Sequence, residues 1–98
     1  MLKYSNKSSL EIVDVSMDFR ALLSATGYIS NPVWSVTVDK GVDASPSSLL
    51  EGTTAVVGTE AFARLHAGTA GVTYKIRCEV DADSGEHFLG EATMQVTS

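Results

Sequence analysis

The segment Val72–Asp81 alternates apolar and polar side chains without interruption. The apolar residues share one parity: they are Val72, Tyr74, Ile76, Cys78 and Val80. A strand places alternate side chains on opposite faces, whereas a helix of this length would distribute the charges around its whole axis. The pattern therefore predicts a β-strand with one buried and one solvated face, as in the middle of an antiparallel sandwich.

Weaker runs of the same kind predict further strands. In Leu10–Phe19 apolar residues alternate with polar ones, but the alternation changes parity between Ile12 and Val13. We interpret this segment as a strand with a β-bulge. Val33–Val38 predicts a second central strand with Trp34 on its inner side. Shorter strands are predicted over residues 54–57 and 61–66, and a last strand carries Phe88, Ala92, Met94 and Val96. We expect an all-β protein, an antiparallel β-sandwich of about seven or eight strands.

Several segments carry turn or edge signals. Arg20–Ala25 has the composition of a single helical turn, too short to form a helix alone. The motif Ser30-Asn31-Pro32 predicts a turn, the segments 68–71 and 81–86 predict loops, and Val42–Val57, broken by a proline, predicts strands at a sheet edge.

Length and patterning predict one domain. The chain has 98 residues, of which 44% are apolar, enough for one core. Residues 1–9 form a polar N-terminal lead-in that we expect to be frayed, and residues 10–98 form a single domain. No repeat or linker divides this domain.

Charge and cysteine content restrict the partners and the compartment. Seven basic and twelve acidic residues give a formal net charge of −5, which disfavours nucleic acid and anionic membrane surfaces as partners. The single Cys78 closes no intrachain disulfide, which fits folding in a reducing compartment. The start is polar and lacks the apolar stretch of a signal peptide, and no apolar run is long enough to cross a bilayer.

No group of residues has the spacing of a metal site. Asp81, Asp83 and Glu86 resemble the beginning of a calcium loop, yet the third oxygen ligand and the terminal glutamate are missing, so we interpret them as a solvated turn, with a weak calcium site as the alternative. His66 and His87 have no cysteine or second histidine at zinc-ligand spacing. We expect both histidines to be partly exposed strand residues. We predict no metal, no cofactor and no metal-ligating residue.

The catalytic signals are equally weak. Cys78 is the one candidate nucleophile, but its parity places it inward, where desolvation raises the pKa of a thiol and suppresses the reactive thiolate. Nucleophile-elbow and phosphate-binding motifs are absent from the sequence. We predict a protein that is not an enzyme and has no catalytic residue; rapid alkylation of Cys78 in the folded protein would contradict this.

Two aromatic residues resemble marks of the immunoglobulin-like sandwich. In that fold a tryptophan on the third strand packs in the core, and a tyrosine near the start of the sixth strand bonds back to the backbone at a corner. Trp34 and Tyr74 stand at such positions, Tyr74 just after the loop 68–71. The resemblance is to disulfide-free domains such as the fibronectin type III and bacterial immunoglobulin-like groups.

A second resemblance covers roughly residues 10 to 97. It is carried by Val15–Phe19, Leu22-Leu23, Pro32–Val36, Gly52–Ala55 and Gly68–Ile76. In the order and spacing of these segments, the chain is similar to small immunoglobulin-like proteins encoded among the virion structural genes of tailed phages and prophages. The resemblance implies a capsid, head–tail junction or fibre-associated component, made and folded in the bacterial cytoplasm and located in the virion. Its partners would be other virion proteins and a second copy of itself, held through a strand edge such as Val42–Val57 or through loops.

The alternative is a carbohydrate-binding or host-surface adhesion domain, since sandwiches often present aromatic side chains to sugars. The chain has seven aromatic residues. We expect Trp34, Phe62, Tyr74 and Phe88 to be needed by the core. Tyr4 and Tyr28 would then be the free stacking platforms.

Overall fold

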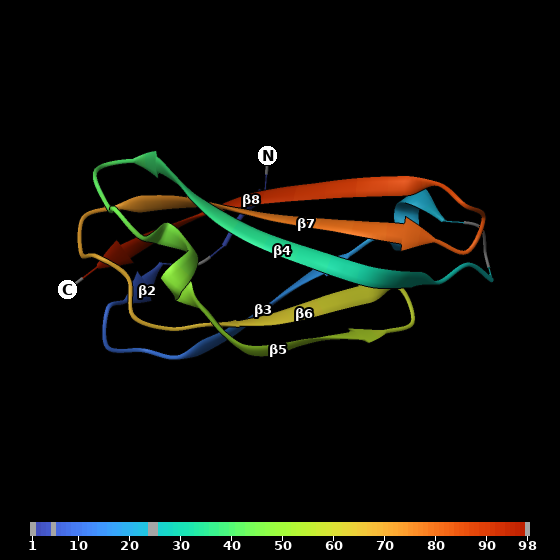
Figure 1. Ribbon diagram of the computed structural model, residues 1–98, viewed down its shortest axis with the longest axis horizontal. Coiled ribbons are helices and arrows are strands. Elements are labelled where there is room, and N and C mark those ends of the chain that lie inside the picture. The colour runs from blue at the N-terminus through green and yellow to red at the C-terminus, as the bar shows by residue number, and fades with distance from the viewer. Residues whose placement is uncertain (1, 5, 24–25, 98) are drawn as a thin grey trace.

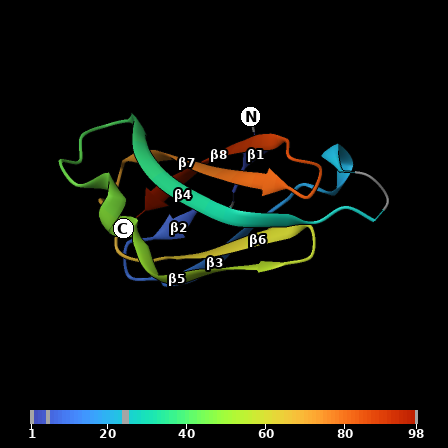
Figure 2. The ribbon, with the colours of Figure 1, turned by 45° about the vertical axis from the view of Figure 1, so that its right-hand side comes forward.

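The larger of two β-sheets contains the strands that the alternating runs predict. The structure is a computed structural model that describes residues 2–4, 6–23 and 26–97. β4 (Ile29–Lys40), β7 (Thr73–Ala82) and β8 (His87–Thr97) pair antiparallel. The short β1 (Leu2–Lys3) and β2 (Lys7–Ser8) pair with β8 in parallel, which gives the order β1-β8-β7-β4 with β2 also on β8 (Figures 1 and 2).

The smaller sheet lies across from it. β3 (Val13–Asp18), β6 (Glu60–Leu65) and β5 (Leu50–Val57) pair antiparallel in the order β3-β6-β5. The views in Figures 1 and 2 show the two sheets as separate layers along the long axis of the molecule. The all-β sandwich of about eight strands is therefore confirmed.

The core fills the space between the layers. Along β7 every second side chain is buried, and Tyr74, Ile76, Cys78 and Val80 have no exposed surface. Trp34 and Val36 of β4 face the same core. The small sheet contributes Val15, Met17, Ala61, Ala63 and Leu65. The alternation in the sequence thus predicted the inner faces of β4 and β7 correctly. β7 lies inside the large sheet, but β4 ends the order β1-β8-β7-β4, so the prediction of a second central strand is wrong.

Gly90 of β8 lies close to side chains that come from the other side of the core. A Cβ built there would lie 2.7 Å from Sδ of Met17 and 3.2 Å from Cζ of Phe19, both from the other side of the core. Because a real Cβ essentially never comes so close to another atom, only glycine fits this position without a shift of its neighbours.

The expected strand over Leu10–Phe19 is shorter than predicted. β3 begins at Val13, and its pairing with β6 continues without a register shift to Asp18. Leu10 and Ile12 are 91% and 60% exposed. The parity change at Ile12 therefore reflects two apolar residues that lie outside the strand, and the predicted bulge there is wrong.

The expected turn at Ser30-Asn31-Pro32 is also wrong. These residues lie inside β4, which shifts register against β7 between Ser30 and Val33. Asn31 has a φ of 52°, the left-handed conformation that asparagine tolerates better than most residues. The turn signal therefore marks a bulge that lets Pro32 sit within an edge strand.

The other local predictions have mixed outcomes. The helical turn is present as η1 (Arg20–Leu22), while Ser24 and Ala25, also in the predicted segment, lie outside the described residues. A second short helix, η2 (Pro46–Leu49), precedes β5. The expectation of a frayed lead-in is wrong for Lys7 and Ser8, which pair with Val96 and Thr97 of β8.

The loops gather at two ends of the sandwich. We call the first the Lys7 end; it contains residues 9–12, 41–49 and 66–72. We call the second the Tyr28 end; its described part contains residues 19–23, 26–28, 58–59 and 83–86. Figure 1 shows the Lys7 end on the left, where η2 lies, and the Tyr28 end on the right.

Candidate interaction surfaces

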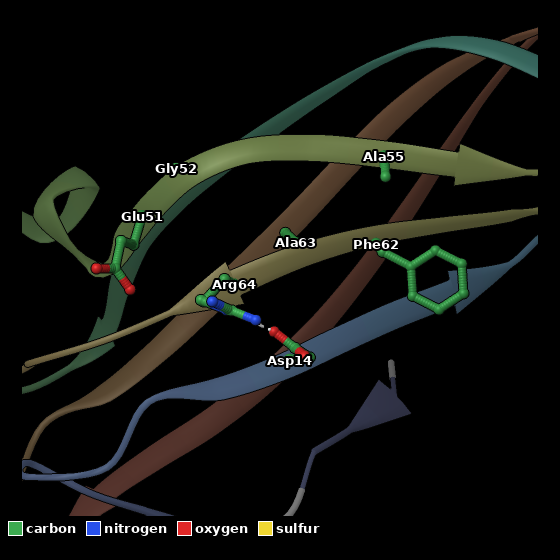
Figure 3. A pocket seen from close by; sticks show the side chains of 7 residues that line it. All are labelled: Asp14, Glu51, Gly52, Ala55, Phe62, Ala63 and Arg64. Atoms are coloured by element: carbon green, nitrogen blue, oxygen red, sulfur yellow. Dashed lines mark hydrogen bonds and ion pairs between the residues drawn. The ribbon is translucent and has the colours of Figure 1, made fainter.

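The outer face of the small sheet carries a hollow. Along β6, Ala61, Ala63 and Leu65 are buried, so that Phe62 and Arg64 fall on the opposite, outer parity. A hollow of about 590 Å³ lies on this face. Its lining residues, drawn in Figure 3, are Asp14, Glu51, Gly52, Ala55, Phe62, Ala63 and Arg64.

An irregularity in β5 lies at this hollow. Glu51 pairs with Arg64 and Ala55 with Phe62, so the pairing shifts register between the two positions. Gly52 in this stretch has a φ of 69°, which favours glycine. Glycine at 52 and alanine at 55 leave space beside the larger side chains, and a partner side chain can occupy that space.

An ion pair borders the hollow. Nε of Arg64 donates to Oδ1 of Asp14 at 2.9 Å, and the two residues are directly opposite in register. Figure 3 shows their side chains pointing toward each other across β6 and β3. The hydrogen bond from Arg64 lowers the pKa of Asp14 and raises that of Arg64. Both side chains are more than half exposed, so the pair contributes little to stability and stays available to a partner.

A second hollow of about 290 Å³ lies beside β3, between the lead-in and the small sheet. Its lining residues are Tyr4, Asn6, Lys7, Val13, Asp14, Val15, Ser16 and Met94. Tyr4 packs against the core, and its hydroxyl donates to the carbonyl of Ser16 at 2.9 Å. Burial raises the pKa of Tyr4 to about 12. The hollow therefore combines an apolar floor with the edge of a strand.

Lys7 is a buried charged residue of the lead-in. Its side chain is 1% exposed, and Nζ donates to the carbonyls of Ser8 at 2.7 Å and Ala67 at 2.6 Å. Desolvation lowers the pKa of Lys7, while Glu11 nearby raises it. The bond to Ala67 fastens the lead-in to the loop after β6. Sequence reasoning missed this role because a lysine in a polar segment carries no signal of burial.

Tyr74 joins two loops at the same end. Its hydroxyl accepts the backbone N–H of Thr69 at 2.9 Å and donates to Oδ2 of Asp43 at 2.5 Å. Burial and the bond to Asp43 raise the pKa of Tyr74, and the same bond lowers that of Asp43. The predicted return of the hydroxyl to an upstream backbone group is present; the contact with Asp43 was not predicted.

The candidates for chemistry are dispersed. Cys78 is fully buried, and desolvation raises its pKa to about 12, as the sequence predicted in direction. His66 follows β6 at the Lys7 end, whereas His87 begins β8 at the other. Among the residues that the structure describes, no three His, Cys, Asp or Glu side chains are placed to hold a metal ion.

His87 lies in an exposed polar group instead. Its Nδ1 is 2.9 Å from Oδ1 of Asp81, and its Nε2 is 3.3 Å from Oε1 of Glu79. The hydrogen bond with Asp81, and then that with Glu79, raises the pKa of His87. In the adjacent turn the Ala82 N–H donates to the Glu86 carbonyl at 2.7 Å, which is the hairpin reversal expected for residues 81–86.

The expectations about the aromatic side chains need correction. Phe62 is on the outer face and lines the larger hollow, because it shares the parity of Arg64 rather than that of Ala61 and Ala63. Tyr4 is not a free platform, since its ring packs against the core and its hydroxyl is bonded. Tyr28 is 56% exposed, as expected. The outward parity of Phe62 was readable from its neighbours.

Helices of the described residues are all too short or too polar to traverse a bilayer. Two layered sheets, with strand edges unpaired among the described residues and with hollows on the surface, define an all-β sandwich domain. Residues 7–96 match the model of a protein family described as podophage GP4 fiber-tail adaptor protein gp77. The chain belongs to this family, and it is a structural component of a phage virion. No curated protein matches the chain. The prediction of a phage structural protein is thereby confirmed.

Proposed function

We propose that this chain joins the tail of a podophage particle to its fibres, as a non-enzymatic adaptor. The family match over residues 7–96 carries the proposal, because the described family is one of fibre–tail adaptors. Contacts with tail and fibre proteins would be made by strand edges and outer faces. The net charge of −5 supports protein partners over nucleic acid or anionic membrane.

We further propose an immunoglobulin-like topology for the domain. The constant-type immunoglobulin sandwich has sheets of strands ABED and CFG. Here β3-β6-β5 has the order of strands B, E and D, and β8-β7-β4 has that of G, F and C. Trp34 lies on the strand in position C, and Tyr74 near the start of the strand in position F. In place of a strand A beside β3, the lead-in pairs with β8.

The adaptor role is tested by assembly. Purified chain is mixed with tail complexes and with the fibre protein of the same phage, separately and together, and the products are sized by gradient centrifugation and imaged by electron microscopy. We expect fibres on tails only when the chain is present. Particles made without the chain that still carry fibres would contradict the proposal.

Several expectations from the sequence stay predictions. They are the division into a lead-in of residues 1–9 and one domain of residues 10–98, the absence of catalytic, metal and cofactor residues, and self-association. Light scattering of the purified chain tests self-association directly.

A further inference from the structure

β3 has an edge with which no described strand pairs. It stands at the end of the order β3-β6-β5. The lead-in runs nearby, but its backbone bonds go to β8: the Tyr4 N–H donates to the Thr93 carbonyl at 2.8 Å, and the Ser9 N–H to the Thr97 carbonyl at 2.7 Å. The lead-in therefore completes the large sheet and leaves the edge of the small sheet open.

The register shows which groups face outward from this edge. Residues on an antiparallel strand direct their N–H and C=O alternately toward and away from one neighbour. The Ser16 carbonyl accepts the Tyr4 hydroxyl and so points away from β6. By alternation the backbone groups of Asp14 and Asp18 point the same way. Such a row is a template for another strand.

The space beside the edge suits alternate side chains of an added strand. The hollow of about 290 Å³ lies directly against β3. Val13, Val15 and Met94 form its apolar part, between the two sheets. A strand bonded to β3 would direct every second side chain onto this apolar floor and the others to the outer face of the small sheet.

Two of the three outer side chains of β3, those of Asp14 and Asp18, are acidic, and the third is that of Ser16. Asp14 and Asp18 are both exposed. Asp14 is paired with Arg64 on the β6 side, whereas Oδ1 of Asp18 accepts the Thr59 hydroxyl and the Arg20 backbone N–H, each at 2.9 Å. Among the described side chains no cation forms an ion pair with Asp18. Opposite charges in directly opposed positions stabilise a strand pair, so lysine or arginine is favoured in the added strand.

The same charges act against a second copy of this chain. Two β3 strands paired antiparallel about Ser16 would place Asp14 of each copy opposite Asp18 of the other. Like charges directly opposite each other destabilise a sheet. The edge therefore resists self-pairing and selects a different partner.

We propose that the open edge of β3 receives an extended segment of another virion protein in which lysine or arginine alternates with apolar residues. The inference rests on the proposed adaptor function for the source of the segment. Tyr4 covers part of the edge, so docking replaces its bond to the Ser16 carbonyl with a backbone bond from the incoming strand.

The experiment uses the whole chain and two synthetic peptides. The first is acetyl-Lys-Val-Lys-Val-Lys-Val-Lys-amide, and the second has glutamate in place of each lysine. Binding is measured by calorimetry, and amide hydrogen exchange is followed by NMR. We expect the cationic peptide to bind and to slow exchange at Asp14, Ser16 and Asp18 at least tenfold, and the anionic peptide to leave these amides unchanged.

A charge-reversed variant and a matched control sharpen the test. Asp14→Lys combined with Asp18→Lys should weaken the binding of the cationic peptide at least tenfold. The same variant should bind the anionic peptide measurably. Asp39→Lys combined with Glu86→Lys makes the same change in net charge at exposed positions outside the edge. This control should change affinity less than threefold. Circular dichroism and thermal unfolding establish that both variants are folded.

The outcomes separate the edge from the adaptor role. Absence of cationic peptide binding, binding without protection of the three amides, equal losses in variant and control, or a β3-paired dimer of the chain would each overturn the edge proposal. If the chain still joins fibres to tails in that case, the adaptor role stands alone. Peptide protection without fibre attachment would overturn the adaptor role and leave the edge as a strand-binding site.

Discussion

At the Lys7 end buried side chains hold the loops, whereas at the Tyr28 end the loops hold one another through backbone and exposed groups. Lys7 reaches the Ala67 carbonyl, and Tyr74 reaches Thr69 and Asp43. Both side chains are at most 1% exposed. These bonds are part-buried, so losing one should cost more than losing a contact that is fully exposed to water.

The Tyr28 end is fastened differently. The Asp83 N–H donates to the Tyr28 carbonyl at 3.1 Å, and the Ile29 N–H donates to the Gly58 carbonyl at 3.1 Å. The side-chain contacts there, such as His87 with Asp81, are exposed to solvent. Water and salt compete with such contacts. Side-chain substitutions should therefore be costly at the Lys7 end, and the Tyr28 end should respond mainly to pH and solvent.

The largest effect is expected for Tyr74→Phe. The change removes the hydroxyl that bonds both Thr69 and Asp43. Because one of these partners is a carboxylate, we expect the free energy of unfolding to fall by about 2 kcal/mol. Urea unfolding measures it. Tyr28→Phe, at a tyrosine that is 56% exposed, is the matched control and should change stability by less than about 0.5 kcal/mol. Equal losses of stability in Tyr74→Phe and Tyr28→Phe would contradict the difference between the two ends.

A smaller loss is expected for Lys7→Met. Methionine keeps an apolar stem and removes the amine, so the carbonyls of Ser8 and Ala67 lose their donor. The variant also avoids burying a charge, whose cost is visible in the lowered pKa of Lys7. The net loss should be about 1 kcal/mol in thermal or urea unfolding. Lys75→Met on the outer face of β7 serves as control; a larger loss there would contradict the role of Lys7.

At the Tyr28 end we expect a pH dependence carried by His87. The pKa of His87 is raised above its ordinary value of 6.5, so its stabilising contribution is complete below pH 6.5 and is lost as pH rises through the folded-state pKa. The pKa of Asp81 is lowered below 3.8, so its contribution is lost when pH falls through that lower value. The pair should stabilise most between these limits.

Urea midpoints measured from pH 3 to pH 9 test this dependence. His87→Gln should flatten the profile above pH 6.5, whereas His66→Gln, at the Lys7 end, should retain the slope of the unaltered protein. If the slope survives in His87→Gln, another group carries it.

The smallest effect is expected for Asp83→Ala. The substitution removes the exposed acceptor of the Tyr28 N–H, at 3.3 Å, but leaves the backbone bond from Asp83 to the Tyr28 carbonyl. We expect an unchanged unfolding midpoint and faster hydrogen exchange at the Tyr28 amide alone. A clear drop in the midpoint would show that this end depends on side chains as the Lys7 end does.

The sandwich was predictable from the sequence where alternation is long. Val72–Asp81 specified β7 and its buried parity, and Val33–Val38 specified the inner face of β4. Shorter alternating runs predicted the local structure wrongly. Leu10 and Ile12 extended a strand pattern into a loop, and apolar character alone does not distinguish the two.

The surfaces were less predictable than the layers. The size and aromatic character of Phe62 predict an inward side chain, although the parity that Phe62 shares with Arg64 indicates the outer face. The burial of Lys7 and the open edge of β3 depend on which sheet the lead-in joins. Pairings between the two ends of a chain are set by tertiary structure, so a single sequence gave no local sign of them.

The close approach at Gly90 gives the protein an internal reporter. Met17 is 3% exposed, and its sulfur lies in the contact that the missing side chain of Gly90 permits. Oxidation of a thioether adds a polar oxygen, for which this contact has no room. Sulfoxide at Met17 would therefore accumulate only when the two layers separate. The mass of the proteolytic peptide that contains Met17 would then report how often the sandwich opens.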